Sequence, residues 1–96
     1  MVKERYKKQI IQAIEKFLPN CKIYLFGSRA TGSHMPTSDI DIAIDNSKPI
    51  KLSVMLELEE FIEDLPIPFE FDIVDLNNAP KDLKKEILKE RVLWKS

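Results

Sequence analysis

The stretch LFGSRATGSHMPTSDIDIAID, residues 25–45, decides the fold expected of this chain. It contains a glycine-serine pair, Gly27 and Ser28, followed after ten residues by an Asp-x-Asp pair, Asp39 and Asp41. A glycine turn lets backbone amides approach phosphate oxygens, and carboxylates can hold a divalent metal ion against the same oxygens. The two halves together indicate chemistry on phosphate groups.

The acidic pair lies on a segment with the period of a β-strand. Over residues 39–45, aspartates and one alanine alternate with isoleucines. Successive side chains of a strand point to opposite faces, so we expect the aspartates on one face and the isoleucines on the other. Taken alone, this pattern also fits the water-exposed face of an ordinary amphipathic strand.

A third aspartate, Asp72, has the parity to join this pair. If its strand lies beside the first acidic strand, Asp39, Asp41 and Asp72 meet on one face. Carboxylates that close raise one another's pKa, and magnesium relieves the repulsion, so the cluster predicts a metal site for two-metal phosphoryl or nucleotidyl transfer. Glu70 shares the parity and is the alternative to Asp72, whereas Asp75 has the opposite parity and should face away.

The rest of the chain alternates between helical and extended patterns. The expected elements, in chain order, are a helix over 3–18, a strand over 22–26, a short helix before Gly32, a strand over 39–45, a helix over 50–64, a strand over 69–75 and a last short helix after Pro80. Residues 92–94 are a candidate for a final extended piece. This order predicts an α/β (α+β) fold, with a small mixed β-sheet flanked by helices.

Size and composition limit the function further. The chain has 96 residues, which predicts one domain over 1–96, and a net charge of -1, which gives no support to direct nucleic-acid binding. Its apolar runs are far shorter than the ~20 residues that cross a bilayer, and residues 1–5 have no apolar secretion signal. Cys21 is the single cysteine, which we interpret as a core or loop residue in a reducing cytoplasm.

Residues 25–45 closely resemble the polymerase-beta-like nucleotidyltransferase superfamily. The small size of the chain makes the minimal nucleotidyltransferases, the MntA-type antitoxins, the nearest likeness. The resemblance covers nearly the whole chain, including the leading helix, the Phe-Asp-Ile-Val-Asp-Leu strand at 71–76 and the Leu-Lys-Lys-Glu-Ile-Leu helix at 83–88. It implies the nucleotidyltransferase fold.

The resemblance also implies roles for individual residues. Gly27 and Ser28 would hold the β- and γ-phosphates of ATP through backbone amides and the hydroxyl. Asp39 and Asp41 would bind two Mg²⁺ ions, and Asp72 would complete the second metal site and activate the attacking hydroxyl. Arg29 would lie near the phosphates.

For three neighbouring residues, the sequence allows other interpretations. A solvated loop cation is an equal alternative for Arg29. Ser38 is expected to cap a turn rather than to steady a carboxylate, and His34 is expected on a surface loop.

The implied function is transfer of AMP from ATP to a partner protein. Larger superfamily members carry an acceptor-binding domain that this chain lacks, so another molecule must bring the acceptor hydroxyl. The family expectation is a HEPN-type toxin modified with AMP on a tyrosine, in a hetero-complex or oligomer. The alternative is an antitoxin that masks the toxin by contact alone, for which Leu88, Leu93 and Trp94 are candidate contact residues, although core packing is the preferred interpretation of all three.

Overall fold

The fold is seen in a computed structural model that describes residues 2–33 and 35–96. The interpretation of His34 therefore lies outside the described residues. The elements are, in chain order, α1 (Glu4–Phe17), β1 (Lys22–Phe26), α2 (Ser28–Thr31), β2 (Ile40–Asp45), α3 (Leu52–Glu63), β3 (Phe71–Asp75), α4 (Lys81–Glu90) and β4 (Val92–Lys95). The first seven confirm the expected order, and the candidate extended piece at 92–94 is a fourth strand.

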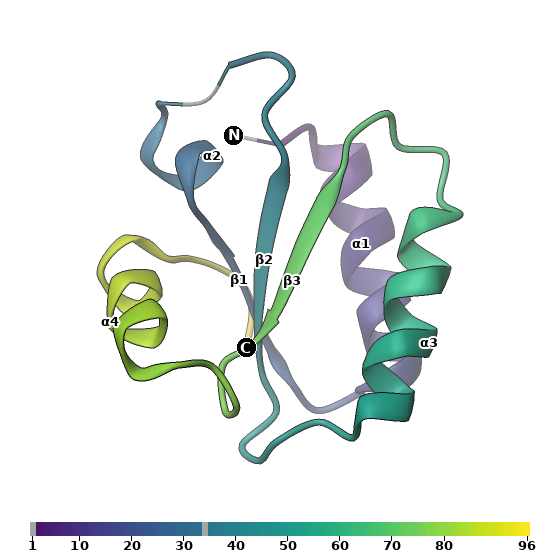
Figure 1. The fold of residues 1–96 in the computed structure, drawn as a ribbon. Helices are drawn as coiled ribbons and strands as arrows, with labels where there is room; N and C mark the ends of the chain where they lie inside the picture. Colours follow the sequence, from purple (N-terminus) through teal and green to yellow (C-terminus); the bar gives the residue numbers. More distant parts are fainter. Residues whose placement is uncertain (1, 34) are drawn as a thin grey trace.

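The four strands form one mixed sheet in the order β3-β2-β1-β4. β1 pairs antiparallel with both β2 and β4, whereas β2 and β3 run parallel. Parallel neighbours need a long crossover, and α3 supplies it here. Figure 1 shows α1 and α3 on one side of the sheet and α4 on the other.

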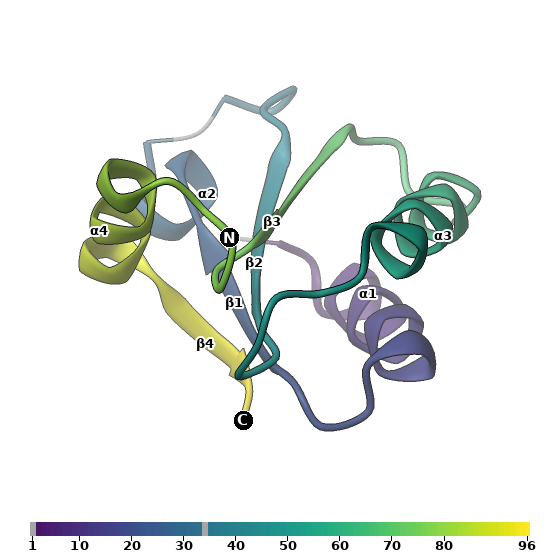
Figure 2. The ribbon, with the colours of Figure 1, turned by 60° about the horizontal axis from the view of Figure 1, so that its bottom comes forward.

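The alternation along β1 and β2 divides the core between the two faces of the sheet. Ile23, Leu25 and the three isoleucines of β2 are completely buried on the face that packs against α1 and α3. Tyr24, Phe26 and Ala43 lie on the other face, in a smaller cluster with Leu76 and Ile87. Figure 2 shows that α4 is the helix that covers this second face. With less apolar cover, the second face is the one that can present acidic side chains to water.

The terminal strand β4 lies at the edge of the sheet beside β1. Lys95 extends from it to donate a hydrogen bond from Nζ to the carbonyl of Cys21, at 3.1 Å. Cys21 is fully buried, which confirms its interpretation as a core residue, and burial raises the pKa of its thiol.

Two of the three residues expected to pack in the core, Leu88 and Leu93, are exposed instead. Leu88 is 42% exposed and Leu93 is 53% exposed, so core packing was the wrong interpretation of these two. Neither side chain belongs to one of the two core clusters, because the apolar cover of the α4 side of the sheet is small. Trp94 is half-buried and packs against the larger core, as expected. In the described part of the chain, no helix is long and apolar enough to cross a membrane.

Candidate active site

Gly27 ends β1 in a backbone conformation that other residues rarely adopt. Its φ of 72° and ψ of -158° fall in a region essentially restricted to glycine. Its carbonyl accepts hydrogen bonds from the amides of Ala30, at 3.1 Å, and Thr31, at 3.2 Å, which begin the single turn of α2. A β-carbon on residue 27 would overlap with the carboxylate of Asp41. Glycine is therefore required here both by its backbone angles and by the neighbouring side chain.

Asp41 and Asp72 are direct partners in the parallel pairing of β2 and β3. The strands are thus neighbours, as the predicted convergence of the carboxylates required. Asp41 is also the partner of Phe26 on β1, so it lies one residue away from the Gly27 turn. Asp39 precedes β2 and is exposed, as is Asp72, whereas Asp41 is half-buried. The glycine turn and two aspartates therefore meet at one end of the sheet.

The environment of Asp41 disfavours its charged form. The pKa of Asp41 is raised from 3.8 to about 6, chiefly by burial and then by the negative charges of Asp72, Asp39 and Glu90, against an opposing effect of Arg29. A carboxylate surrounded by like charges and partly removed from water is unfavourable unless a cation joins it. Such perturbed groups are typical of functional sites.

Arg29 organises the loop that leads into β2. The side chain is 5% exposed, so the solvated-cation alternative is wrong. Its guanidinium donates from Nε, at 3.0 Å, and Nη2, at 2.8 Å, to the carbonyl of Ser38, and it lies over the ring of Phe69 with 4.5 Å to the centroid. Arg29 thereby fixes the residue that immediately precedes Asp39. Its contact with phosphate stays a prediction.

Ser38 caps the turn before the acidic strand. Its hydroxyl accepts a hydrogen bond from the amide of Met35, at 2.8 Å, which confirms capping as its role. The amide of Ser38 in turn donates to the carbonyl of Met35, at 3.0 Å. Together with Arg29, this reciprocal pair gives the short segment before Asp39 a defined shape.

The remaining acidic residues of the two strands take structural positions. Asp75 accepts hydrogen bonds from the amides of Ile50, at 2.8 Å, and Asn77, at 3.0 Å, and so faces away from the cluster as expected. Asp45 accepts hydrogen bonds from the amide of Ser47, at 2.9 Å, and from Nδ2 of Asn77, at 3.0 Å, and these two bonds lower its pKa.

Glu70, the alternative to Asp72, lies just before β3, whereas Asp72 lies within the strand. The backbone carbonyl of Glu70 accepts a hydrogen bond from the amide of Ile40, at 2.9 Å, just before β3 begins. Asp72, and not Glu70, is the β3-side carboxylate whose charge raises the pKa of Asp41. The register thus favours Asp72 as the third acidic residue.

Glu90 belongs to the site, and the sequence patterns did not reveal it. As the last residue of α4, it accepts a hydrogen bond from the amide of Gly27 on Oε1, at 3.1 Å. The pairing of Val92 with Leu25 brings the end of α4 back to the end of β1. The one sequence feature that could have indicated the position of Glu90 was the extended piece at 92–94. If that piece forms an antiparallel strand beside β1, Glu90 lies close to Gly27.

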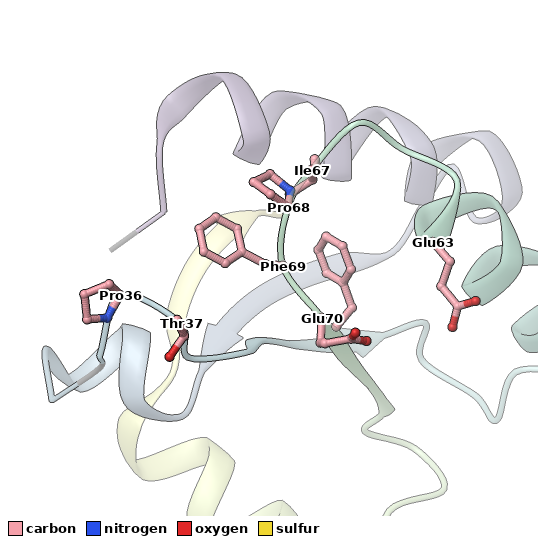
Figure 3. Close-up of a pocket in the computed structure, with 8 residues that line it drawn as sticks. Pro36, Thr37, Glu63, Ile67, Pro68, Phe69 and Glu70 are labelled. Carbon is pink, nitrogen blue, oxygen red and sulfur yellow. The ribbon is translucent and has the colours of Figure 1, made fainter.

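A pocket of about 590 Å³ lies near the start of β3, and its lining includes none of the three predicted aspartates. It lies between the end of α3, the loop before β2 and the chain that enters β3 (Figure 3). Its lining combines apolar rings with the carboxylates of Glu63 and Glu70. A smaller cavity of about 110 Å³, which also involves Glu63, is lined by Asp72. Both cavities are lined by Glu63 of α3, which lies on the side of the sheet opposite to α4 (Figure 1).

The donor atoms of the site suit a hard divalent cation. Carboxylate oxygens are preferred by Mg²⁺, which is usually held by one or two carboxylates together with water and substrate phosphates. In residues 2–33 and 35–96, no three His, Cys, Asp or Glu side chains form a group that could hold a metal ion by themselves. The charges of Asp39 and Asp72 both act on Asp41, so the three carboxylates are neighbours, and phosphate oxygens would have to complete a metal site among them.

A family model described as Polymerase beta, Nucleotidyltransferase matches residues 8–96 of the chain. The chain belongs to this family. MJ0126 of Methanocaldococcus jannaschii, whose assigned name is that of a protein adenylyltransferase, is 32% identical over 93 residues, which cover 97% of this chain and 93% of that protein. These matches confirm the resemblance found in residues 25–45 and make the chain a nucleotidyltransferase.

Two further relatives extend the likeness. MntA of Haemophilus influenzae, also named as a protein adenylyltransferase, is 26% identical over 76 residues, covering 79% of this chain and 67% of that protein. A crystal structure of a toxin-antitoxin with AMP-PNP superposes with a TM-score of 0.79 at 27% identity, over 92% of this chain and 71% of that one. The α/β nucleotidyltransferase fold expected from the sequence is thereby confirmed.

Proposed function

We propose that this chain transfers AMP from ATP to a hydroxyl group of a partner protein, and that the partner is a HEPN-type toxin that the transfer neutralises. The observation that carries the proposal is the register of β2 and β3, which sets Asp72 beside Asp41 next to the Gly27 turn. The names of the relatives support the reaction class, and the similar toxin-antitoxin structure with AMP-PNP supports both the nucleotide and the kind of partner. We place the reaction in the cytoplasm, where ATP is available and Cys21 stays reduced.

In this proposal, each residue acts on a particular part of the nucleotide. Gly27 and Ser28 hold the β- and γ-phosphates. Arg29 acts indirectly, because its hydrogen bonds to the carbonyl of Ser38 fix the loop that positions Asp39. Asp39, Asp41 and Asp72 would hold two Mg²⁺ ions, which neutralise the phosphates and lower the pKa of the attacking hydroxyl. Their donor chemistry fits that role, since a cation relieves the repulsion that raises the pKa of Asp41.

The reaction is a single displacement at phosphorus. The hydroxyl oxygen of the partner forms a bond to the α-phosphorus of ATP, and the bond between that phosphorus and the bridging oxygen of pyrophosphate breaks. Asp72, exposed on the β3 side, accepts the proton of the hydroxyl directly or through water. The products are the AMP-modified partner and pyrophosphate.

The partner would bring the acceptor from the β3 edge of the sheet, where Asp72 is exposed. A small cavity at this edge is lined in part by Asp72, the proposed base. Toward β1, the last residue of α4 contacts the Gly27 amide.

The test uses the purified chain, ATP labelled on the α-phosphate, Mg²⁺ and the protein encoded beside this chain. We expect label on the partner with the wild type and none with the Asp39→Ala, Asp41→Ala double variant. Omission of Mg²⁺ should abolish labelling as well. Unlabelled partner in every reaction contradicts the proposal.

A masking antitoxin is the second candidate, because Leu88 and Leu93 are exposed apolar side chains on neighbouring elements. That function predicts that wild type and the double aspartate variant inhibit the partner equally, without label. It also predicts that Leu88→Ser and Leu93→Ser weaken inhibition while they leave ATP binding intact.

A further inference from the structure

Glu90 accepts a hydrogen bond from the backbone amide of Gly27, the same amide that the proposed function assigns to the nucleotide phosphates. The amide of Gly27 donates to Glu90 Oε1, at 3.1 Å. This contact is built into the fold, because α4 ends at Glu90 and β4 follows after one residue to pair with β1. The helix cannot withdraw Glu90 without losing that pairing, so the change that frees the amide must come from the side chain.

The surroundings of Glu90 are unfavourable for a carboxylate. It lies at the C-terminal end of α4, where the exposed carbonyls carry partial negative charge. Its charge also adds to the effects of Asp72 and Asp39 in raising the pKa of Asp41. Within the described part of the chain, the salt bridge that forms joins Lys95 to Glu15 and does not involve Glu90. The hydrogen bond from Gly27 is therefore the contact that favours the observed position.

A carboxylate and a phosphate group compete for such a donor. Both present anionic oxygens that accept strong hydrogen bonds from backbone amides. One N–H cannot serve two acceptors at full strength, and a triphosphate that approaches Gly27 also meets the charge of Glu90. The same residue therefore opposes the nucleotide both by occupying the amide and by repulsion.

We propose that Glu90 acts as an internal substitute for a phosphate oxygen: it holds the Gly27 amide in the nucleotide-free protein and must leave it when the triphosphate binds. Glu90 thereby sets the affinity for the nucleotide, which is lower than the turn would otherwise provide. This inference rests on the proposed function, since it takes ATP to be the ligand of the Gly27 turn.

The first experiment measures binding of AMP-PNP with Mg²⁺ by calorimetry. Glu90→Gln keeps the size of the side chain and removes its charge, and we expect it to bind about tenfold more tightly than the wild type, which corresponds to about 1.4 kcal/mol. Glu86→Gln is the matched control: Glu86 is exposed one turn earlier on α4, and its affinity should stay within about twofold of the wild type. Equal or weaker binding by Glu90→Gln overturns the inference.

The second experiment observes the amide directly and needs no nucleotide. The chain has 2 glycines, so labelling with ¹⁵N-glycine gives an NMR spectrum with one signal each for Gly27 and Gly32. Loss of a charged acceptor should move the Gly27 proton signal upfield in Glu90→Ala and leave the Gly32 signal in place. A Gly27 signal that does not move overturns the inference.

The two experiments separate failure of the inference from failure of the proposed function. Binding of AMP-PNP by the wild type, without a gain in Glu90→Gln, counts against Glu90 alone. Absence of AMP-PNP binding in the wild type, Glu90→Gln and Glu90→Ala contradicts the nucleotide site itself, and the role of Glu90 with it.

Discussion

The carboxylate of Asp41 lies directly against the α-carbon of Gly27, so that a β-carbon there would be 3.0 Å from Asp41 Cγ and would overlap with Oδ2. The proposed phosphate-binding turn and the proposed metal-binding strand are thus in contact and cannot change independently. Any side chain on residue 27 must displace the acidic residue that the site depends on.

Gly27→Ala should therefore damage both stability and nucleotide binding. The backbone angles of residue 27 are costly for alanine, and we expect a loss of about 1–3 kcal/mol in the free energy of unfolding. Displacement of Asp41 should also abolish Mg²⁺-dependent stabilisation by ATP. Denaturant unfolding and thermal melts with and without ATP measure the two effects.

Gly32→Ala is the matched control for that variant. Gly32 also has a positive φ, of 83°, but a β-carbon there meets nothing within 4 Å. We expect a loss of about 1 kcal/mol from backbone strain, with the ATP-induced rise in melting temperature retained. If Gly32→Ala loses the ATP effect as well, strain alone explains the result and the contact with Asp41 does not.

Strand alternation is the reason that the acidic residues were predictable from sequence. The period of two is a local property, and it placed Asp41 and Asp72 on one face once β2 and β3 proved to be neighbours. Glu90 was not predictable in the same way, because its position depends on β4 returning beside β1. The burial of Arg29 also depends on distant residues, since Phe69 and the carbonyl of Ser38 surround its guanidinium.

Asp41→Asn should stabilise the metal-free protein at neutral pH. The folded-state pKa of Asp41, about 6, lies above its ordinary value of 3.8, so the folded protein binds more protons than the unfolded chain between these values. Stability therefore falls as pH rises through this window, and ionised Asp41 is destabilising at pH 7. In EDTA, we expect Asp41→Asn to melt above the wild type at pH 7 and level with it below about pH 4. A melting temperature below that of the wild type at pH 7 would contradict the raised pKa.

Asp45→Asn, on the same strand, should have the opposite effect. Hydrogen bonds from the Ser47 amide and the Asn77 side chain lower the pKa of Asp45. A lowered folded-state pKa contributes stability above the unfolded-state value, and that contribution is lost as pH falls through the folded-state value. Asp45→Asn should therefore melt below the wild type at pH 7, and the difference should shrink toward acid. Thermal melts of both variants over one pH series test the two signs together.

Asp72→Asn and Glu70→Gln separate the two candidates for the third carboxylate. Asp72 is the register partner of Asp41, whereas Glu70 lines the neighbouring pocket. We expect Asp72→Asn to lower the rate of AMP transfer about 10²–10⁴-fold, the range usual for loss of a catalytic acid or base. Glu70→Gln should keep the rate within about tenfold of the wild type. The reverse ranking in single-turnover labelling assays would assign the role to Glu70.

Arg29→Lys tests whether the loop before Asp39 is held from within the protein. Lysine keeps the charge but cannot reproduce the paired hydrogen bonds to the carbonyl of Ser38 or the flat contact with Phe69. We expect a loss of about 1–3 kcal/mol in the free energy of unfolding, together with slower AMP transfer. Arg91→Lys is the control: Arg91 is exposed, and its contact with the ring of Tyr24, 4.8 Å from the centroid, should be worth about 0.5 kcal/mol. Equal destabilisation by the two variants would show that the buried contacts of Arg29 do not fix the loop.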